Sequence, residues 1–270
     1  MRRTMLSVAL FGLILLATPA APACNSCFRT ALVRFGAADC VVVGRIAALE
    51  SKTVFALPHA GATMKKEYGV GMLEITQAIK GGEGLTHLRI GLLPCQRAAL
   101  GKEACFFLFP HFEETFFITP RQFGEPLIKE GNRGFDAEIR RYQHWAELQK
   151  DPSAGLKSRD ADERFVTAAL LVSQYRNFVP GFHAENRKTD LIDAEQSRLI
   201  MLALAEADWD AIEKRHDLPI EWLFNRLDIN AKDGWERRRF AHDENVLHAA
   251  MQQWLKDHVK TYRIAAFAQG

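Results

Sequence analysis

The sequence predicts an α+β fold in which a β-rich front half precedes a helical back half. Short apolar runs rich in β-branched residues, punctuated by glycine and proline, continue to about residue 125. From residue 135 onward, apolar residues recur at helical spacing. All five cysteines lie before residue 106. We therefore expect a disulfide-bonded β domain over residues 24–130 and an all-helical domain over residues 131–270.

Five strands are expected in the front half, and each is a short apolar run that ends at a charge, a glycine turn or a proline. The third run alternates cleanly, with Leu88, Ile90 and Leu92 on one face. Five such strands suit a small sandwich or barrel, and a five-stranded, partly open barrel is one standard solution. The expected strands cover residues 38–46, 68–79, 87–92, 105–109 and 115–119.

The back half is expected to contain a small bundle or a few stacked helical hairpins. Asp160 followed by Glu163 resembles a capping box at the start of one helix, and Asp243 is placed to cap the last. The polar stretch 177–188, which contains Pro180-Gly181, is expected to be a loop. The expected helices cover residues 135–146, 160–173, 190–207, 219–227 and 243–262.

Residues 1–23 have the composition of a secretory signal peptide. Two arginines precede an uncharged apolar run, and the small-residue motif Ala21-Pro22-Ala23 is typical of a cleavage site. A membrane anchor and a lipid-anchored Cys24 are the alternatives, but the apolar run is shorter than the roughly 20 residues that a span requires. We expect cleavage after Ala23 and a secreted or periplasmic mature chain that begins at Cys24.

Charge and composition narrow the classes of partner. Two of the 35 basic residues lie in residues 1–23, so the mature chain carries 33 basic and 33 acidic side chains. A formally neutral chain is not a typical nucleic-acid-binding protein. No second long apolar stretch follows residue 23, so we expect no membrane span in the mature form.

The pair Cys24-Asn25-Ser26-Cys27 has the C-x-x-C spacing of redox, haem and zinc motifs. No strand can precede it in the mature chain, Phe28 replaces the histidine of a haem site, and no second pair completes a zinc site. Disulfides to later strands are therefore favoured, and one of the five cysteines must remain unpaired within the chain. No cofactor and no metal is expected in the free protein.

Few residues suggest catalysis. His183, Glu185 and Asp193 crowd a predicted loop and would be the candidates for a hydrolase-type site in the helical domain or an interdomain cleft. Glu244 and His248 are at i, i+4 spacing, which is commonly a surface pair. The run Arg237-Arg238-Arg239 is interpreted as a solvated charge run, and no catalytic residue is assigned.

The front half resembles the netrin-type module, whose best-known members are the tissue inhibitors of metalloproteinases. The resemblance covers about residues 24–125 and depends on a cysteine at the mature N-terminus, a second cysteine soon after, and the Ala38-Asp39 start of a hydrophobic strand. It implies an OB-type β-barrel with the disulfides Cys24–Cys95 and Cys27–Cys105, and a free thiol at Cys40. The leading pair is C-x-x-C where the inhibitors have C-x-C, and the helical half has no counterpart in them.

In those inhibitors the first cysteine's α-amine and carbonyl chelate the protease's zinc. The resemblance therefore implies a partner-contact ridge at Cys24, Asn25 and Ser26, with a zinc metalloprotease as one candidate partner. The expected function is that of an exported binding or regulatory protein rather than an enzyme. The alternatives are the hydrolase-type enzyme described above and a structural envelope protein.

Overall fold

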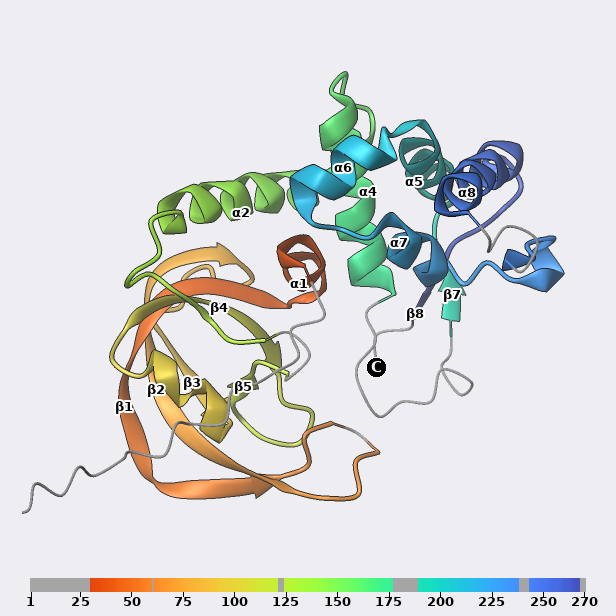
Figure 1. The fold of residues 1–270 in the computed structure, drawn as a ribbon. Coiled ribbons are helices and arrows are strands. Elements are labelled where there is room, and N and C mark those ends of the chain that lie inside the picture. The colour runs from red at the N-terminus through yellow and green to blue at the C-terminus, as the bar shows by residue number, and fades with distance from the viewer. Residues whose placement is uncertain (1–29, 60, 121–123, 177–188, 238–242, 268–270) are drawn as a thin grey trace, which may run out of the picture.

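The computed structural model describes residues 30–59, 61–120, 124–176, 189–237 and 243–267. The chain is α+β, with a six-stranded sheet in the front half and helices after it (Figure 1). The predicted signal peptide, its cleavage site and the 177–188 loop lie outside the described residues.

The sheet begins with two long antiparallel strands, and its order is β1-β2-β3-β5-β4-β6. Strand β1 also pairs with β4, so the path of hydrogen-bonded neighbours from β1 through β2, β3, β5 and β4 returns to β1. All pairings are antiparallel except β3 with β5. The strands are β1 (Cys40–Ala56), β2 (Lys66–Lys80), β3 (His87–Leu92), β4 (Glu103–Pro110), β5 (Phe117–Ile118) and β6 (Leu127–Ile128), and a 3-10 helix, η1 (Pro94–Ala99), follows β3.

All five expected strands are present, and β3 has the predicted bounds. The prediction of only five was wrong, because the two-residue β6 adds a sixth strand beside Ala104 and Cys105 of β4. Strand β1 runs ten residues beyond the expected end at residue 46. Its second half is mostly exposed and pairs only with β2, so it lacks the apolar run that marks the buried first half.

The helices after the sheet are α2 (Phe135–Lys150), α3 (Pro152–Leu156), α4 (Ala161–Tyr175), α5 (Ala194–Glu206), α6 (Trp209–His216), α7 (Ile220–Arg226), the 3-10 helix η4 (Ala231–Asp233) and α8 (Glu244–His258). The expectation of an all-helical back half was wrong in one place. Strands β7 (Thr189–Leu191) and β8 (Ala265–Phe267) form a separate antiparallel pair. Three residues per strand are too few to give a period-2 pattern in the sequence.

Among the described residues, one helix precedes the sheet. Helix α1 (Ala31–Ala37) is capped by Thr30, whose hydroxyl accepts a hydrogen bond from the amide of Val33 at 3.4 Å. It lies between the sheet and α4 (Figure 1). A Cβ on Gly36 would lie 2.7 Å from Cβ of Ser173, so glycine permits the close approach of α1 to α4.

Alternating residues of β1 and β4 divide between two apolar clusters. Val41, Val43 and Phe107 belong to a cluster that continues through α1 and the helices. Val42 and Phe106 belong to a second cluster, which lies on the opposite face of these strands. Both faces of these strands are therefore buried. The face that carries Val41, Val43 and Phe107 packs against the helices in one continuous core. Within the described residues, no helix is both long and apolar enough to cross a membrane.

Candidate functional site

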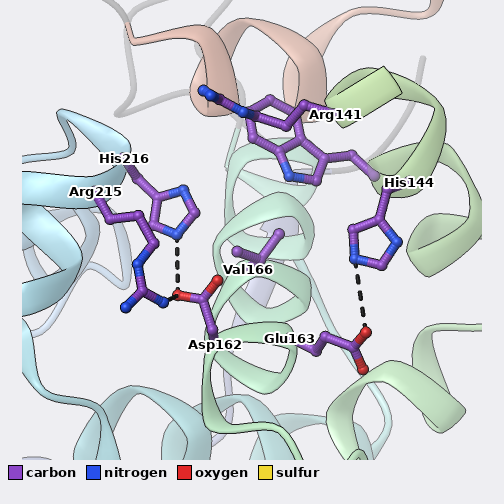
Figure 2. A pocket seen from close by; sticks show the side chains of 8 residues that line it. Arg141, His144, Asp162, Glu163, Val166, Arg215 and His216 are labelled. Atoms are coloured by element: carbon purple, nitrogen blue, oxygen red, sulfur yellow. Dashed lines mark hydrogen bonds and ion pairs between the residues drawn. The ribbon is translucent and has the colours of Figure 1, made fainter. Parts of the chain in front are cut away.

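A groove in the helical part lies between α2, α4 and α6 (Figure 2). It has a volume of about 280 Å³. Two carboxylates extend from α4, and the histidine and arginine side chains that face them come from α2 and α6 (Figure 2). The lining residues are Arg141, His144, Trp145, Asp162, Glu163, Val166, Arg215 and His216.

The first turn of α4 holds both carboxylates in place. Asp160 caps the helix by accepting from the amide of Asp162 at 2.8 Å, which confirms the predicted cap. Glu163 does not close a capping box directly. Its carboxylate accepts from the Ser158 hydroxyl at 2.6 Å, and that hydroxyl accepts from the amide of Asp160 at 3.1 Å. The Ser158 hydroxyl thus bridges the Glu163 carboxylate and the Asp160 amide, which would be in direct contact in the predicted capping box.

Asp162 holds the end of α6 against α4. One oxygen, Oδ1, lies 2.7 Å from Nη1 of Arg215 and 3.1 Å from Nε2 of His216. The His216 side chain is only 7 % exposed, so this imidazole is a buried partner of the carboxylate. Arg215 and His216 both lie in the last turn of α6, where the helix dipole favours the positive charge of the Arg215 guanidinium.

A second histidine–carboxylate pair lies across the groove. Nε2 of His144 is 3.7 Å from Oε1 of Glu163, and the His144 side chain is 53 % exposed. This imidazole can therefore reach a molecule in the groove, whereas His216 is enclosed. Among the described residues, no group of three or more His, Cys, Asp or Glu side chains is arranged to hold a metal ion.

A second candidate surface lies where the β1–β2 loop meets the β4–β5 loop. Nδ1 of His111 accepts from the amides of Glu113 and Glu114, each at 3.1 Å. Because Nδ1 is the acceptor, Nε2 carries the proton and donates to the Leu57 carbonyl at 2.9 Å. The neutral imidazole thus joins one loop to the other, and it also contacts the ring of Tyr68 on β2, edge to face.

Large apolar side chains are exposed on these joined loops and on the strand that leads into them. Phe55 is 60 % exposed at the end of β1, and Met64 is 68 % exposed in the β1–β2 loop. Phe112, in the β4–β5 loop, is 46 % exposed and stacks on His111 at a ring separation of 4.9 Å. We call Phe55, Met64 and Phe112 the loop-pair surface. Aromatic and methionine side chains are enriched at protein interfaces.

The residues singled out in the sequence do not form a common site among the described residues. The predicted ridge Cys24, Asn25 and Ser26 lies outside the described residues, as do His183 and Glu185. Asp193, the third candidate of the hydrolase-type set, caps α5 by accepting from the amide of Gln196 at 3.0 Å. That backbone hydrogen bond lowers the pKa of the Asp193 carboxyl.

The other polar residues noted in the sequence have structural contacts. His248 packs its ring against Trp209 at 5.4 Å, and Glu244 is in the first turn of α8, which Asp243 caps as predicted. Nη1 of Arg237 lies 2.5 Å from Oε1 of Glu221. Arg238 and Arg239 lie outside the described residues.

Two of the cysteines are buried thiols in the sheet. Cys40 begins β1 and Cys105 is in β4, and both are free in this structure. Burial raises the pKa of Cys40 to about 11 and that of Cys105 to about 12, so both thiols are protonated near neutral pH and are weak nucleophiles. Cys24 and Cys27, the predicted partners of Cys95 and Cys105, lie outside the described residues, so both pairings stay predictions.

Sequence analysis did not find the groove or the loop-pair surface. Asp162 and His216 are 54 residues apart, and His111 and Leu57 are also 54 apart. No local spacing rule connects residues at such separations. The one local signal was the cap at Asp160, which places Asp162 and Glu163 in a first turn without indicating what they contact.

Comparison with known proteins gives no relative: no protein-family model, no curated protein and no solved structure matches this chain.

Proposed function

We propose that this protein is an exported binding or regulatory protein whose sheet is an OB-type barrel. The observation that carries the proposal is the order of strand neighbours, in which β1 pairs with both β2 and β4 while β3 runs parallel to β5. The closed order β1-β2-β3-β5-β4-β1 is the one expected of an OB-type barrel, the fold that the netrin-type resemblance implies. OB-type barrels bind ligands at the β2–β3 face and at the β1–β2 and β4–β5 loops.

The loop-pair surface lies at this binding position. His111 fixes the two loops relative to each other, which reduces the ordering cost of binding there. Phe55, Met64 and Phe112 supply exposed apolar area, and Glu113 and Glu114 supply charge beside it. A protein partner with a complementary apolar patch fits this chemistry best.

The binding test uses the mature chain as bait in exported-protein extract, with chemical cross-linking. We expect the wild type to capture a partner. The Phe55→Ser/Phe112→Ser variant should bind that partner at least tenfold more weakly, a loss of about 1.4 kcal/mol in binding free energy. The matched control is Leu191→Ser/Val246→Ser, which changes two exposed apolar residues elsewhere. Equal capture by all three proteins would rule out the loop-pair surface.

The predicted ridge Cys24-Asn25-Ser26 is a separate part of the proposal, with a zinc metalloprotease as partner. An α-amine and adjacent carbonyl can occupy the open position of a catalytic zinc. The mature chain should inhibit such a protease, and one extra alanine before Cys24 should abolish inhibition by moving the amine. Unchanged inhibition by the extended chain would exclude zinc chelation. Non-reducing peptide mapping of the same sample tests Cys24–Cys95 and Cys27–Cys105.

The groove supports a second candidate function, hydrolysis by general acid–base catalysis. The favouring observation is the exposed His144 imidazole beside the Glu163 carboxylate, opposite the buried Asp162–His216 pair. A carboxylate that hydrogen-bonds to a histidine makes it a better general base, so this function requires the 3.7 Å separation between Nε2 of His144 and Oε1 of Glu163 to shorten to hydrogen-bond distance when a substrate binds. Activity on a panel of chromogenic esters and phosphoesters should fall at least 100-fold in His144→Ala and persist in His248→Ala. Absence of turnover in the wild type would eliminate this candidate.

A further inference from the structure

The imidazole of His111 holds the β4–β5 loop through the ring nitrogen that carries no proton. Nδ1 accepts from the amides of Glu113 and Glu114, each at 3.1 Å, and His111 is only 5 % exposed. A neutral imidazole has one nitrogen that accepts, whereas both nitrogens of the charged imidazolium are donors. An N–H at Nδ1 would therefore point at two amide N–H groups. Protonation of His111 is incompatible with this conformation of the loop.

The base of the same loop is held by contacts that do not involve the imidazole. The backbone amide of His111 donates to the Phe116 carbonyl at 3.0 Å, and β4 pairs with β5 beyond that point. The Thr115 hydroxyl accepts from Nη1 of Arg89 on β3 at 2.7 Å. Residues 112–114 lie between these fixed points, so a change of conformation that follows protonation is confined to them.

This short segment carries part of the loop-pair surface. The ring of Phe112 stacks on the imidazole at a centroid separation of 4.9 Å and an angle of 21°. Phe55 and Met64 come from the end of β1 and from the β1–β2 loop, which the imidazole contacts through its other nitrogen, Nε2. A rearrangement of residues 112–114 therefore moves Phe112 relative to the other two side chains of the surface.

The charged and titratable groups around the imidazole come from its own loop and from the elements beside it. They are Glu113 and Glu114 in the loop itself, Tyr68 on β2, His59 in the β1–β2 loop, and Arg89 on β3, which attracts Glu114. Burial raises the pKa of Tyr68, so its phenol stays neutral where histidines ordinarily titrate. The two glutamates can accept from a protonated Nδ1 once the backbone amides have turned away.

We propose that residues 112–114 form a pH switch that controls the loop-pair surface. When Nδ1 of His111 is protonated, the amides of Glu113 and Glu114 turn away from the ring and Phe112 leaves its place on the imidazole. A partner that contacts both loops is bound while the imidazole is neutral and is released on acidification. The inference rests on the proposed function, because it concerns the regulation of the same surface.

The switch is tested by NMR spectroscopy of the mature chain from about pH 7.5 to about pH 5, the range in which histidines ordinarily change charge. We expect the backbone amide resonances of Glu113 and Glu114 to shift with the same midpoint as the imidazole C–H resonances of His111. The nuclear Overhauser contact between the rings of His111 and Phe112 should be lost over the same range. A charged imidazole that keeps this contact, or an imidazole that stays neutral at about pH 5, would overturn the proposal.

Two variants assign the pH response to one residue. In His111→Asn, the side-chain oxygen replaces Nδ1 as an acceptor and cannot be protonated, so the amides of Glu113 and Glu114 should lose the midpoint. His87→Asn removes an exposed histidine of β3 and should retain it. The same midpoint in His111→Asn would contradict the assignment. If His111→Asn does not fold, the wild-type titration decides.

A second measurement connects the switch to binding. Capture of the partner by the wild type should be at least tenfold weaker at about pH 5 than at about pH 7.5, whereas capture by His111→Asn should not depend on pH. Equal capture by the wild type at both pH values would refute the regulation of binding. Failure to capture any partner at about pH 7.5 would instead refute the proposed binding function, and the NMR titration, which uses no partner, would still decide whether the loop is a switch.

Discussion

Lys80 lies in an environment unlike that of a typical surface lysine. Its ammonium lies at the carboxyl end of α1, where the carbonyls of Phe35 and Gly36 lack helical partners and the helix dipole is negative. It also lies 5.4 Å from the centre of the Phe35 ring. Burial nevertheless dominates and lowers the pKa of Lys80 to about 8, against the opposing effect of Asp39.

This shift predicts a pH dependence of stability. The ordinary pKa of a lysine is 10.5, so between about pH 8 and pH 10.5 the unfolded chain binds a proton that the folded chain does not. Stability contributed by this residue therefore rises with pH across that window. Cys40 acts in the opposite direction, because its raised pKa makes the folded chain hold a proton that the unfolded chain loses.

The comparison of wild type with Lys80→Met isolates the contribution of Lys80 to the pH dependence of stability. Urea unfolding at about pH 7.5 and about pH 9.5 should show the wild type gaining on the order of 2 kcal/mol relative to Lys80→Met at the higher pH. Lys256→Met, at an exposed position on α8, is the control and should follow the wild type. Parallel pH profiles for wild type and Lys80→Met would contradict the assignment of the shift to burial of this amine.

At the scale of helices and strands, the sequence predicted the elements whose hydrophobic pattern or cap can be recognised within one continuous segment. Strand β3 was found at its full length because Leu88, Ile90 and Leu92 alternate, and α4 and α8 were found with their caps at Asp160 and Asp243. Helices α1, α3 and α6 were not predicted. They have seven, five and eight residues, and helices this short depend on tertiary packing rather than on their own propensity. The seven-residue α7 was predicted because Pro219 marks its start.

Helix α1 shows that dependence at Gly36. A Cβ at this position would lie 2.7 Å from Cβ of Ser173 and 2.9 Å from the carbonyl oxygen of Leu170, and the second contact is with backbone that cannot rotate away. Gly36→Ala should therefore push α1 from α4 and cost about 1–3 kcal/mol of unfolding free energy, despite alanine's better helix propensity.

Gly134→Ala is the matched control for this substitution. Gly134 precedes α2 at a φ of −90°, and its added Cβ would meet only the Asn132 side chain, at 3.4 Å. Its unfolding free energy should stay within about 0.5 kcal/mol of the wild type. Chemical denaturation monitored by circular dichroism measures both variants, and equal stability of Gly36→Ala and Gly134→Ala would show that α1 is not closely packed on α4.

At the scale of the whole molecule, the sequence composition divides the chain into a β-rich and a helical part, but the hydrophobic core is continuous across both parts. The sequence separates a strand-forming part from a helix-forming part near residue 130, and the structure changes from β6 to α2 between Ile128 and Phe135. One apolar cluster nevertheless includes Val41 and Phe107 of the sheet together with Trp145 and Leu170 of the helices. Local patterns cannot reveal such a shared core, because its members are far apart in the chain.

This shared cluster predicts that sheet and helices unfold together. All five tryptophans follow residue 131, so their fluorescence reports only on the helical part. The buried thiol of Cys40 reports on the sheet, because it becomes reactive only when β1 opens. Mass mapping of labelled peptides distinguishes Cys40 from the other cysteines. The urea midpoint for tryptophan emission should coincide with the midpoint for Cys40 labelling in short pulses of a thiol reagent.

The Gly36→Ala variant sharpens this test, because α1 belongs to the front half of the chain and packs on a helix of the back half. In a single cooperative unit, the substitution lowers the tryptophan midpoint and the Cys40 midpoint by the same amount. In two independent domains, the sheet and the helices would respond unequally, and their midpoints would separate in the wild type as well. Coincident midpoints would therefore mean that residues 24–130 and 131–270 are two structural regions that fold as one, with α1 and the cluster around Phe107 and Leu170 as the connection.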